Sequence, residues 1–145
     1  AGSDNHYSQP GHHQRYFGEG GGLAAVFAED LSREAVFDAL RDRRCYAVTG
    51  ARILLDFRVD GHWMGQEILT KGPRKIVVRV VGSWPIESVE IIRNNEVFVT
   101  RSGDGEEMAF EYVDDEPVVG EASYYARVKQ EDGHMAWSSP VWVRS

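Results

Sequence analysis

The chain has 145 residues, of which 42% are hydrophobic and 27% charged. This composition is typical of one globular domain with an appendage, and it excludes a disordered chain. The formal net charge of −7 disfavours nucleic-acid binding, which depends on cations that neutralise phosphates. Its single cysteine, Cys45, excludes an internal disulfide framework. No apolar run approaches the roughly 18 residues of a membrane span, so we expect a cytoplasmic protein without nucleic-acid or membrane partners.

The first segment, residues 1–22, is rich in Gly, His, Ser and Gln and has neither helical nor strand periodicity. It carries Asp4 and His6 in a D-x-H arrangement. In an extended backbone, residues two apart project to the same side, so this carboxylate and imidazole can converge on one cation. Zn²⁺, Mn²⁺ and Fe²⁺ accept that mixture of ligands. Asp4 and His6 are therefore candidate metal ligands, whereas His12 and His13 are either further ligands or solvated side chains.

Residues 23–28 (LAAVFA) form a short apolar run, which predicts an extended segment. A helix is predicted from Ser32 to about Arg43, because the Ser32 hydroxyl can accept a hydrogen bond from a free N–H of the first turn. Leu31 and Val36 have the spacing of a hydrophobic staple across this cap. The basic run RDRR at residues 41–44 is interpreted as the solvated end of the helix.

From Cys45 onward, apolar residues recur at every second position, and turn signals follow about every ten residues. The turn signals are Asp60-Gly61, Asn94-Asn95 and Asp132-Gly133. This pattern predicts about seven or eight short strands in an antiparallel β-sandwich of the immunoglobulin or fibronectin type III kind. The whole chain is thus expected to be mainly β, with one α-helix and an irregular N-terminal segment before the sandwich. The predicted division places residues 1–44 before a sandwich domain of residues 45–145.

Two further groups of residues allow a functional and a structural interpretation. The aromatic residues could form a stacking platform for sugars or fill the core and cover its ends, and packing is the commoner role in a sandwich. The acidic runs at residues 104–107 and 114–116 lack EF-hand spacing and are interpreted as solvated loops. The aromatic residues in question are Trp63, Trp84, Trp137, Trp142, Tyr124 and Tyr125.

A family resemblance extends over nearly the whole chain. The stretch GSDNH, followed by GGGLAAVFAEDLSREAVFDALRDRRCYAVTGARILLDFRV, resembles the closing section of a metal-dependent hydrolase barrel. The family is the polymerase-and-histidinol-phosphatase (PHP) superfamily, in particular a group of uncharacterised PHP-like proteins whose barrel continues into a β-rich C-terminal region. The later stretches VEIIRNNEVFV and YYARVKQEDGHMAWSSPVWV are similar to that region.

The resemblance implies that Asp4 and His6 match the superfamily's SDxH ligand pair, with Zn, Mn or Fe as the metal in the parent protein. The superfamily's H-x-H motif, bridging Glu and further histidines do not occur in this chain. Because PHP chemistry needs two or three clustered metals, the chain by itself is expected to be an inactive C-terminal part of a phosphoester hydrolase. Its sandwich would then be an accessory or structural module.

The predicted helix, Ser32–Arg43, carries an apolar stripe of Val36, Ala39 and Leu40. In the parent this stripe would pack on the upstream barrel. In the isolated chain it should fold back on the sandwich or, failing that, form a homodimer. The alternative from a different functional class is a stand-alone Ig-like module that binds carbohydrate or protein, and a purely structural spacer also stays open.

Overall fold

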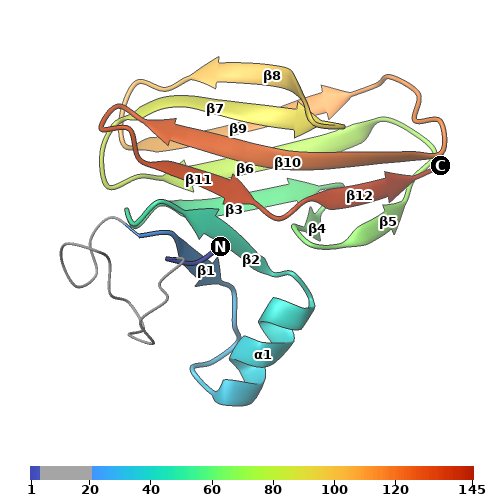
Figure 1. Cartoon of the computed structure of the whole chain (residues 1–145). Coiled ribbons are helices and arrows are strands. Elements are labelled where there is room, and N and C mark those ends of the chain that lie inside the picture. Colours follow the sequence, from blue (N-terminus) through green and yellow to red (C-terminus); the bar gives the residue numbers. More distant parts are fainter. Residues whose placement is uncertain (4–20) are drawn as a thin grey trace.

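The structure, a computed structural model, describes residues 1–3 and 21–145, which form two β-sheets with one helix beside them (Figure 1). The chain is mainly β, as the sequence predicts. The larger sheet has eight strands: β1 (Leu23–Val26), β2 (Cys45–Val48), β5 (Glu67–Leu69), β7 (Ile86–Arg93), β8 (Glu96–Ser102), β10 (Glu121–Gln130), β11 (Met135–Ser138) and β12 (Val141–Arg144). The smaller sheet has four: β3 (Leu54–Val59), β4 (His62–Trp63), β6 (Arg74–Val81) and β9 (Glu107–Asp114).

Strand β10 organises the larger sheet. It pairs antiparallel with β7 on one side and with β11 and then β12 on the other. Strand β8 continues the sheet beyond β7. Between β11 and β12, at Pro140, the outer neighbour changes: β11 pairs with β2, whereas β12 pairs in parallel with β5. In the smaller sheet β6 lies between β3 and β9, antiparallel to both.

The inward side chains of both sheets form one hydrophobic core, so the architecture is a β-sandwich. Strand β6 shows the predicted alternation, because Ile76, Val78 and Val80 are buried in this core. The buried cluster extends from Tyr46 to Val143, within the range predicted for the sandwich domain, and the division at residue 45 stays a prediction. Strand β9 follows the same alternation, because three residues two positions apart pack against the cluster: Met108, Phe110 and Tyr112.

The three predicted hairpin turns are confirmed. Asn94 and Asn95 connect β7 to β8 with φ of 52° and 68°, the left-handed backbone that a tight two-residue hairpin requires. Asp60 (φ 51°) leads the turn from β3 to β4. Gly133 (φ 86°) lies in the turn from β10 to β11, where the Gln130 N–H donates to the carbonyl of residue 134. Local sequence therefore sets the register of these strand pairs.

The predicted helix is confirmed as α1 (Arg33–Arg41). The Ser32 hydroxyl caps it by accepting the Ala35 N–H at 3.1 Å. The predicted hydrophobic staple is wrong, because Leu31 is 99% exposed. The helix also ends two residues earlier than predicted, since Arg43 adopts a left-handed φ of 58° that an α-helix cannot continue through.

Helix α1 connects β1 to β2, and this β1–α1–β2 unit is joined to the other strands by the β2–β11 pairing and by contacts at Gly65. The Gly65 N–H donates to the Pro140 carbonyl (2.8 Å), and its carbonyl accepts the Arg43 Nε–H (2.9 Å). A Cβ on Gly65 would lie 2.6 Å and 2.5 Å from the carbonyl oxygens of Asp42 and Arg43. Arg43 also lies over the Trp142 ring, 5.2 Å from its centroid. The interpretation of residues 41–44 as merely solvated is therefore wrong for Arg43, which holds the helix end against the sandwich.

Candidate functional site

The predicted metal ligands Asp4 and His6, like His12 and His13, lie outside the residues that the structure describes. Metal ligation by Asp4 and His6 therefore stays a prediction. The described residues on either side of that stretch are in contact, because a Cβ on Gly22 would lie 2.6 Å from the Gly2 carbonyl oxygen. Gly2 and Gly22, on either side of residues 4–20, therefore lie next to each other at the start of β1.

Elsewhere, in residues 1–3 and 21–145, no three His, Cys, Asp or Glu side chains are grouped so that they could hold a metal. His62 is exposed in β4. His134 Nδ1 lies 3.0 Å from Thr49 Oγ1, and the same hydroxyl accepts the Met135 N–H. These contacts hold the β10–β11 turn against Thr49, which directly follows β2, so His134 has a structural role. No helix among these residues is long and apolar enough to cross a membrane.

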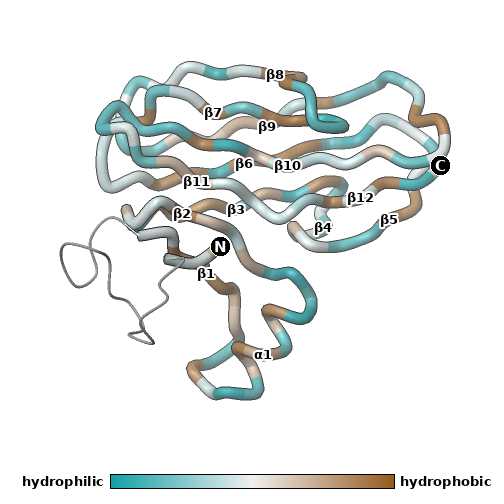
Figure 2. The backbone as a smooth tube through the Cα atoms, in the orientation of Figure 1, coloured by the Kyte–Doolittle hydropathy of each residue, from teal (hydrophilic) through white to brown (hydrophobic). Residues whose placement is uncertain are grey.

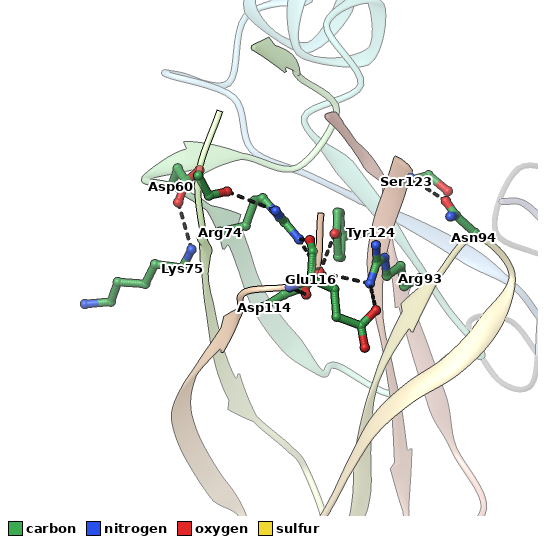
Figure 3. A network of polar contacts seen from close by, with 10 residues as sticks. Asp60, Arg74, Lys75, Arg93, Asn94, Asp114, Glu116, Ser123 and Tyr124 are labelled. Carbon is green, nitrogen blue, oxygen red and sulfur yellow. Dashed lines mark hydrogen bonds and ion pairs between the residues drawn. The ribbon is translucent and has the colours of Figure 1, made fainter. Parts of the chain in front are cut away.

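A buried polar network joins the two sheets at one end of the sandwich (Figure 3). Its centre is Asp114, the last residue of β9, whose Oδ2 accepts the Tyr124 hydroxyl at 2.5 Å and pairs with Arg74 Nη2 at 2.8 Å. Arg74 is the directly opposite residue on β6, and Tyr124 comes from β10 of the other sheet. Arg93 Nη1 approaches the same Asp114 oxygen to 3.4 Å. The prediction that residues 114–116 are a solvated loop is therefore wrong for Asp114.

The network shifts the ionisation of its members. Burial alone would raise the pKa of Asp114, but the hydrogen bonds from Tyr124 and Arg74 outweigh it and lower that pKa. Burial and the adjacent Asp114 carboxylate raise the pKa of Tyr124 to about 12. Arg93 also pairs with the Glu116 carboxylate, so two arginines face two carboxylates. Because these charges balance, the arrangement stabilises the fold and offers no excess charge to a ligand.

The tryptophans divide into separate environments. Trp63 packs edge-on against Phe27 with ring centroids 4.9 Å apart, and the Arg58 guanidinium lies 3.9 Å from its ring centroid. Trp84 lies between β6 and β7 and is 53% exposed. Tyr124, considered above as part of a stacking platform, is fully buried in the core. Packing is thus the confirmed role for Trp63 and Tyr124.

Three aromatic residues share the outer face of the larger sheet, and we name them the aromatic row. Trp137 is opposite Arg127 and Trp142 is opposite Ser123, so Tyr125 lies diagonal to both tryptophans. All three are half-buried, while their neighbours along each strand are buried in the core. At about 3.4 Å per residue, the two tryptophans are separated along the sheet by about 14 Å, with Tyr125 midway. The row therefore runs along β10 and its β11–β12 edge, with the Arg43 guanidinium over the Trp142 ring.

The apolar stripe of α1 is only partly covered. Ala39 is fully buried and Val36 is half-buried. Leu40 is 46% exposed, and Phe37 beside it is 63% exposed. The expectation that the stripe folds back on the sandwich is therefore wrong for Leu40. The sandwich closes its own core without these side chains.

The sequence of the chain is similar to those of other proteins. A family described as "Protein of unknown function (DUF3604)" matches residues 3–74. Proteins described as uncharacterised from Chlamydia trachomatis and Chlamydia muridarum are 38% and 37% identical over 139 residues, in matches that cover 84% of this chain. The chain spans 22% of the length of each of these relatives. No solved structure matches the chain.

Proposed function

We propose that this chain is part of a longer metal-dependent hydrolase that acts on phosphate esters, with residues 45–145 as an accessory β-sandwich. The accessory role rests on the exposed Phe37 and Leu40 of α1, in a chain that spans only 22% of its relatives. The hydrolase class rests on the resemblance of the Asp4-x-His6 segment to the PHP superfamily. The DUF3604 match includes this segment.

The donor chemistry of Asp4 and His6 fits a divalent metal. A carboxylate oxygen and an imidazole nitrogen are ligands that Zn²⁺, Mn²⁺ and Fe²⁺ all accept. When bound, such a metal lowers the pKa of a coordinated water and so supplies the attacking hydroxide. Two ligands fall short of the three or four protein ligands that a zinc site uses, so the remaining ligands would come from other parts of the longer protein.

We also assign the sandwich to the immunoglobulin or fibronectin type III kind. The strand pairing supports this, because β3, β6 and β9 share one sheet while β8, β7, β10 and the broken β11–β12 strand share the other. Tyr124 supports it as well. Its buried hydroxyl donates to Asp114 at the end of the preceding strand, much as a tyrosine corner bonds back across the loop between two strands.

The hydrolase proposal is tested with the 145-residue chain and the longer protein that contains it. Both are assayed against a panel of phosphate mono- and diesters with Mn²⁺ or Zn²⁺. We expect turnover by the longer protein and none by the 145-residue chain. Equal turnover by both would contradict the need for ligands from outside the chain, and inactivity of both would contradict the phosphoesterase assignment.

The aromatic row supports a second candidate function, binding of a neutral carbohydrate to the outer face of the larger sheet. Trp137 and Tyr125 offer apolar ring surfaces against which the C–H faces of sugars can pack, beside Trp142, whose ring Arg43 overlies. The charged side chains around the row are matched in pairs, so the face provides polar groups with little net charge. The pairs are Arg127–Glu90, Lys129–Glu87 and Arg144–Glu121.

A further inference from the structure

The β1–α1–β2 unit presents apolar side chains to solvent on the part of the molecule that projects beyond the sandwich (Figure 1). Leu31 is 99% exposed, Phe37 63% and Leu40 46%. An amphipathic helix of a globular protein normally buries its apolar stripe, and α1 buries only Ala39 completely. These exposed residues lie within ten positions of one another, around a single short helix. They form a patch whose covering surface is not supplied by the described residues.

Strand β1 adds a second uncovered surface at the other end of the unit. Among the described strands β1 pairs only with β2, and its sequence, LAAV, has no charge or proline of the kind that protects an edge strand. Beside it lies a mostly apolar groove of about 220 Å³, formed with Val48 and Ile53. Leu23 (39% exposed) and Leu54 (61% exposed) lie at this groove. Brown segments mark the apolar residues of β1 and α1 in Figure 2.

The unit cannot easily rotate to bury these surfaces on its own sandwich. Strand β2 is hydrogen-bonded to β11 through a three-residue register. The helix end is held at Gly65, where Arg43 donates to the Gly65 carbonyl and the two backbones are too close for a Cβ. The apolar side chains are therefore presented outward from a fixed support, as at an interface with another folded body.

We propose that the rest of the longer protein docks on the β1–α1–β2 unit at two exposed apolar surfaces, the α1 patch of Leu31, Phe37 and Leu40 and the β1 groove between Leu23 and Leu54 of β3. This inference rests on the proposed function, in which the chain belongs to such a protein. The docking partner is the portion of that protein outside these 145 residues. Relatives that match 84% of this chain have more than three-quarters of their length outside the match.

The residues matched by the DUF3604 family agree with this docking partner. The match covers residues 3–74, which contain the whole β1–α1–β2 unit and the Gly65 joint, and it ends at the first residue of β6. The region that this family model matches thus contains the proposed docking surface and its attachment.

Hydroxyl-radical footprinting read by mass spectrometry tests the proposal. The 145-residue chain and the longer protein are labelled under identical conditions. We expect Leu31, Phe37 and Leu40 to be labelled in the short chain and several-fold less in the longer protein. Leu69 (83% exposed) and Val119 (92% exposed) lie on the sandwich away from the unit and serve as matched controls, whose labelling should be equal in both proteins.

Equal labelling of Phe37 and Leu40 in both proteins would overturn the proposal. Protection that rises with the concentration of the 145-residue chain would also overturn it, because the docking partner would then be a second copy. Two double variants extend the test to stability: Phe37→Glu with Leu40→Glu, and the control Leu69→Glu with Val119→Glu. Only the first should lower the melting temperature of the longer protein, and neither should change that of the short chain.

These readouts do not depend on catalysis, so the two proposals can fail separately. Protection of α1 in a longer protein that is inactive on phosphoesters would support the docking surface and contradict the hydrolase assignment. Phosphoesterase activity of the longer protein without protection of α1 would support the hydrolase assignment and contradict the docking surface.

Discussion

Asp114 and Arg74 form an ion pair of 2.8 Å between adjacent strands of the smaller sheet, with side-chain exposures of 0% and 3%. Tyr124 from the other sheet donates its hydroxyl to the same carboxylate. The pair therefore links β6, β9 and β10 at one point. Burying these charged groups costs little folding free energy only while each keeps its oppositely charged or hydrogen-bonding partner.

Replacing Asp114 by Asn should destabilise the fold strongly. The substitution keeps the shape but leaves the guanidiniums of Arg74 and Arg93 without their shared carboxylate, and breaking such a buried pair costs about 3–5 kcal/mol. Asp115→Asn is the matched control, because Asp115 is the exposed neighbour in the same sequence run. The free energy of unfolding in urea measures both. A loss for Asp114→Asn no larger than that of the control would contradict a structural role for the network.

The same carboxylate should make stability depend on pH in the acid range. The pKa of Asp114 is lowered in the folded state from the ordinary value of 3.8, so the unfolded chain takes up its proton first. The stabilisation is complete above about pH 4 and is lost as the pH falls through the folded-state pKa. The difference in unfolding free energy between wild type and Asp114→Asn should therefore shrink below that pH. A difference that stays constant down to pH 2 would contradict this prediction.

Replacing Gly65 by Ala should loosen the joint between α1 and the sandwich. Gly65 has a φ of 91°, and an added Cβ would lie 2.5 Å from the Arg43 carbonyl oxygen. Gly61→Ala is the control, since Gly61 also has a positive φ (79°) but has open space around its Cβ position. Hydrogen exchange should accelerate in α1 and β2 for Gly65→Ala alone. Equal exchange in both variants would mean that backbone strain, and not the close approach, dominates.

If the aromatic row binds carbohydrate, Trp137→Ala and Trp142→Ala should each reduce binding to a neutral glycan by roughly two- to tenfold. A stacked aromatic ring contributes about 0.5–1.5 kcal/mol, and 1.4 kcal/mol corresponds to one factor of ten. Trp84→Ala removes an exposed tryptophan outside the row and should leave binding unchanged. A glycan array screened with the 145-residue chain identifies the probe, and isothermal titration quantifies it. Silence across the array would dismiss this candidate function.

Much of the fold follows from local signals in the sequence. Period-two alternation identified β6 and β9, while Asn94-Asn95 identified the β7–β8 hairpin and Asp60-Gly61 the β3–β4 hairpin. Side-chain alternation and left-handed backbone are properties of neighbouring residues, so local sequence reveals them. The parallel pairing of β5 with β12 was not predicted. It joins segments far apart in the chain, and no local signal encodes such a contact.

The polar network was missed although part of its signal is present. Counting by twos from Ile76 back to Arg74, and from Tyr112 forward to Asp114, places both charged residues on the inward face of their strands. Two inward-facing opposite charges at matching strand ends indicate a buried pair. The end of α1 shows the opposite case. Helix α1 ends at Arg41, and Arg43 beyond it donates to the Gly65 carbonyl, a contact that composition near the helix does not reveal.

The central claim is that Asp4 and His6 complete a metal site in a longer hydrolase, and the metal content of that protein tests it most directly. Wild type, Asp4→Ala, His6→Ala and the control His62→Ala are desalted and analysed by inductively coupled plasma mass spectrometry. Wild type and the control should retain bound Zn, Mn or Fe, and the Asp4 and His6 variants should lose at least one equivalent. Unchanged metal content in those two variants, or a metal-free wild-type protein, would contradict the claim.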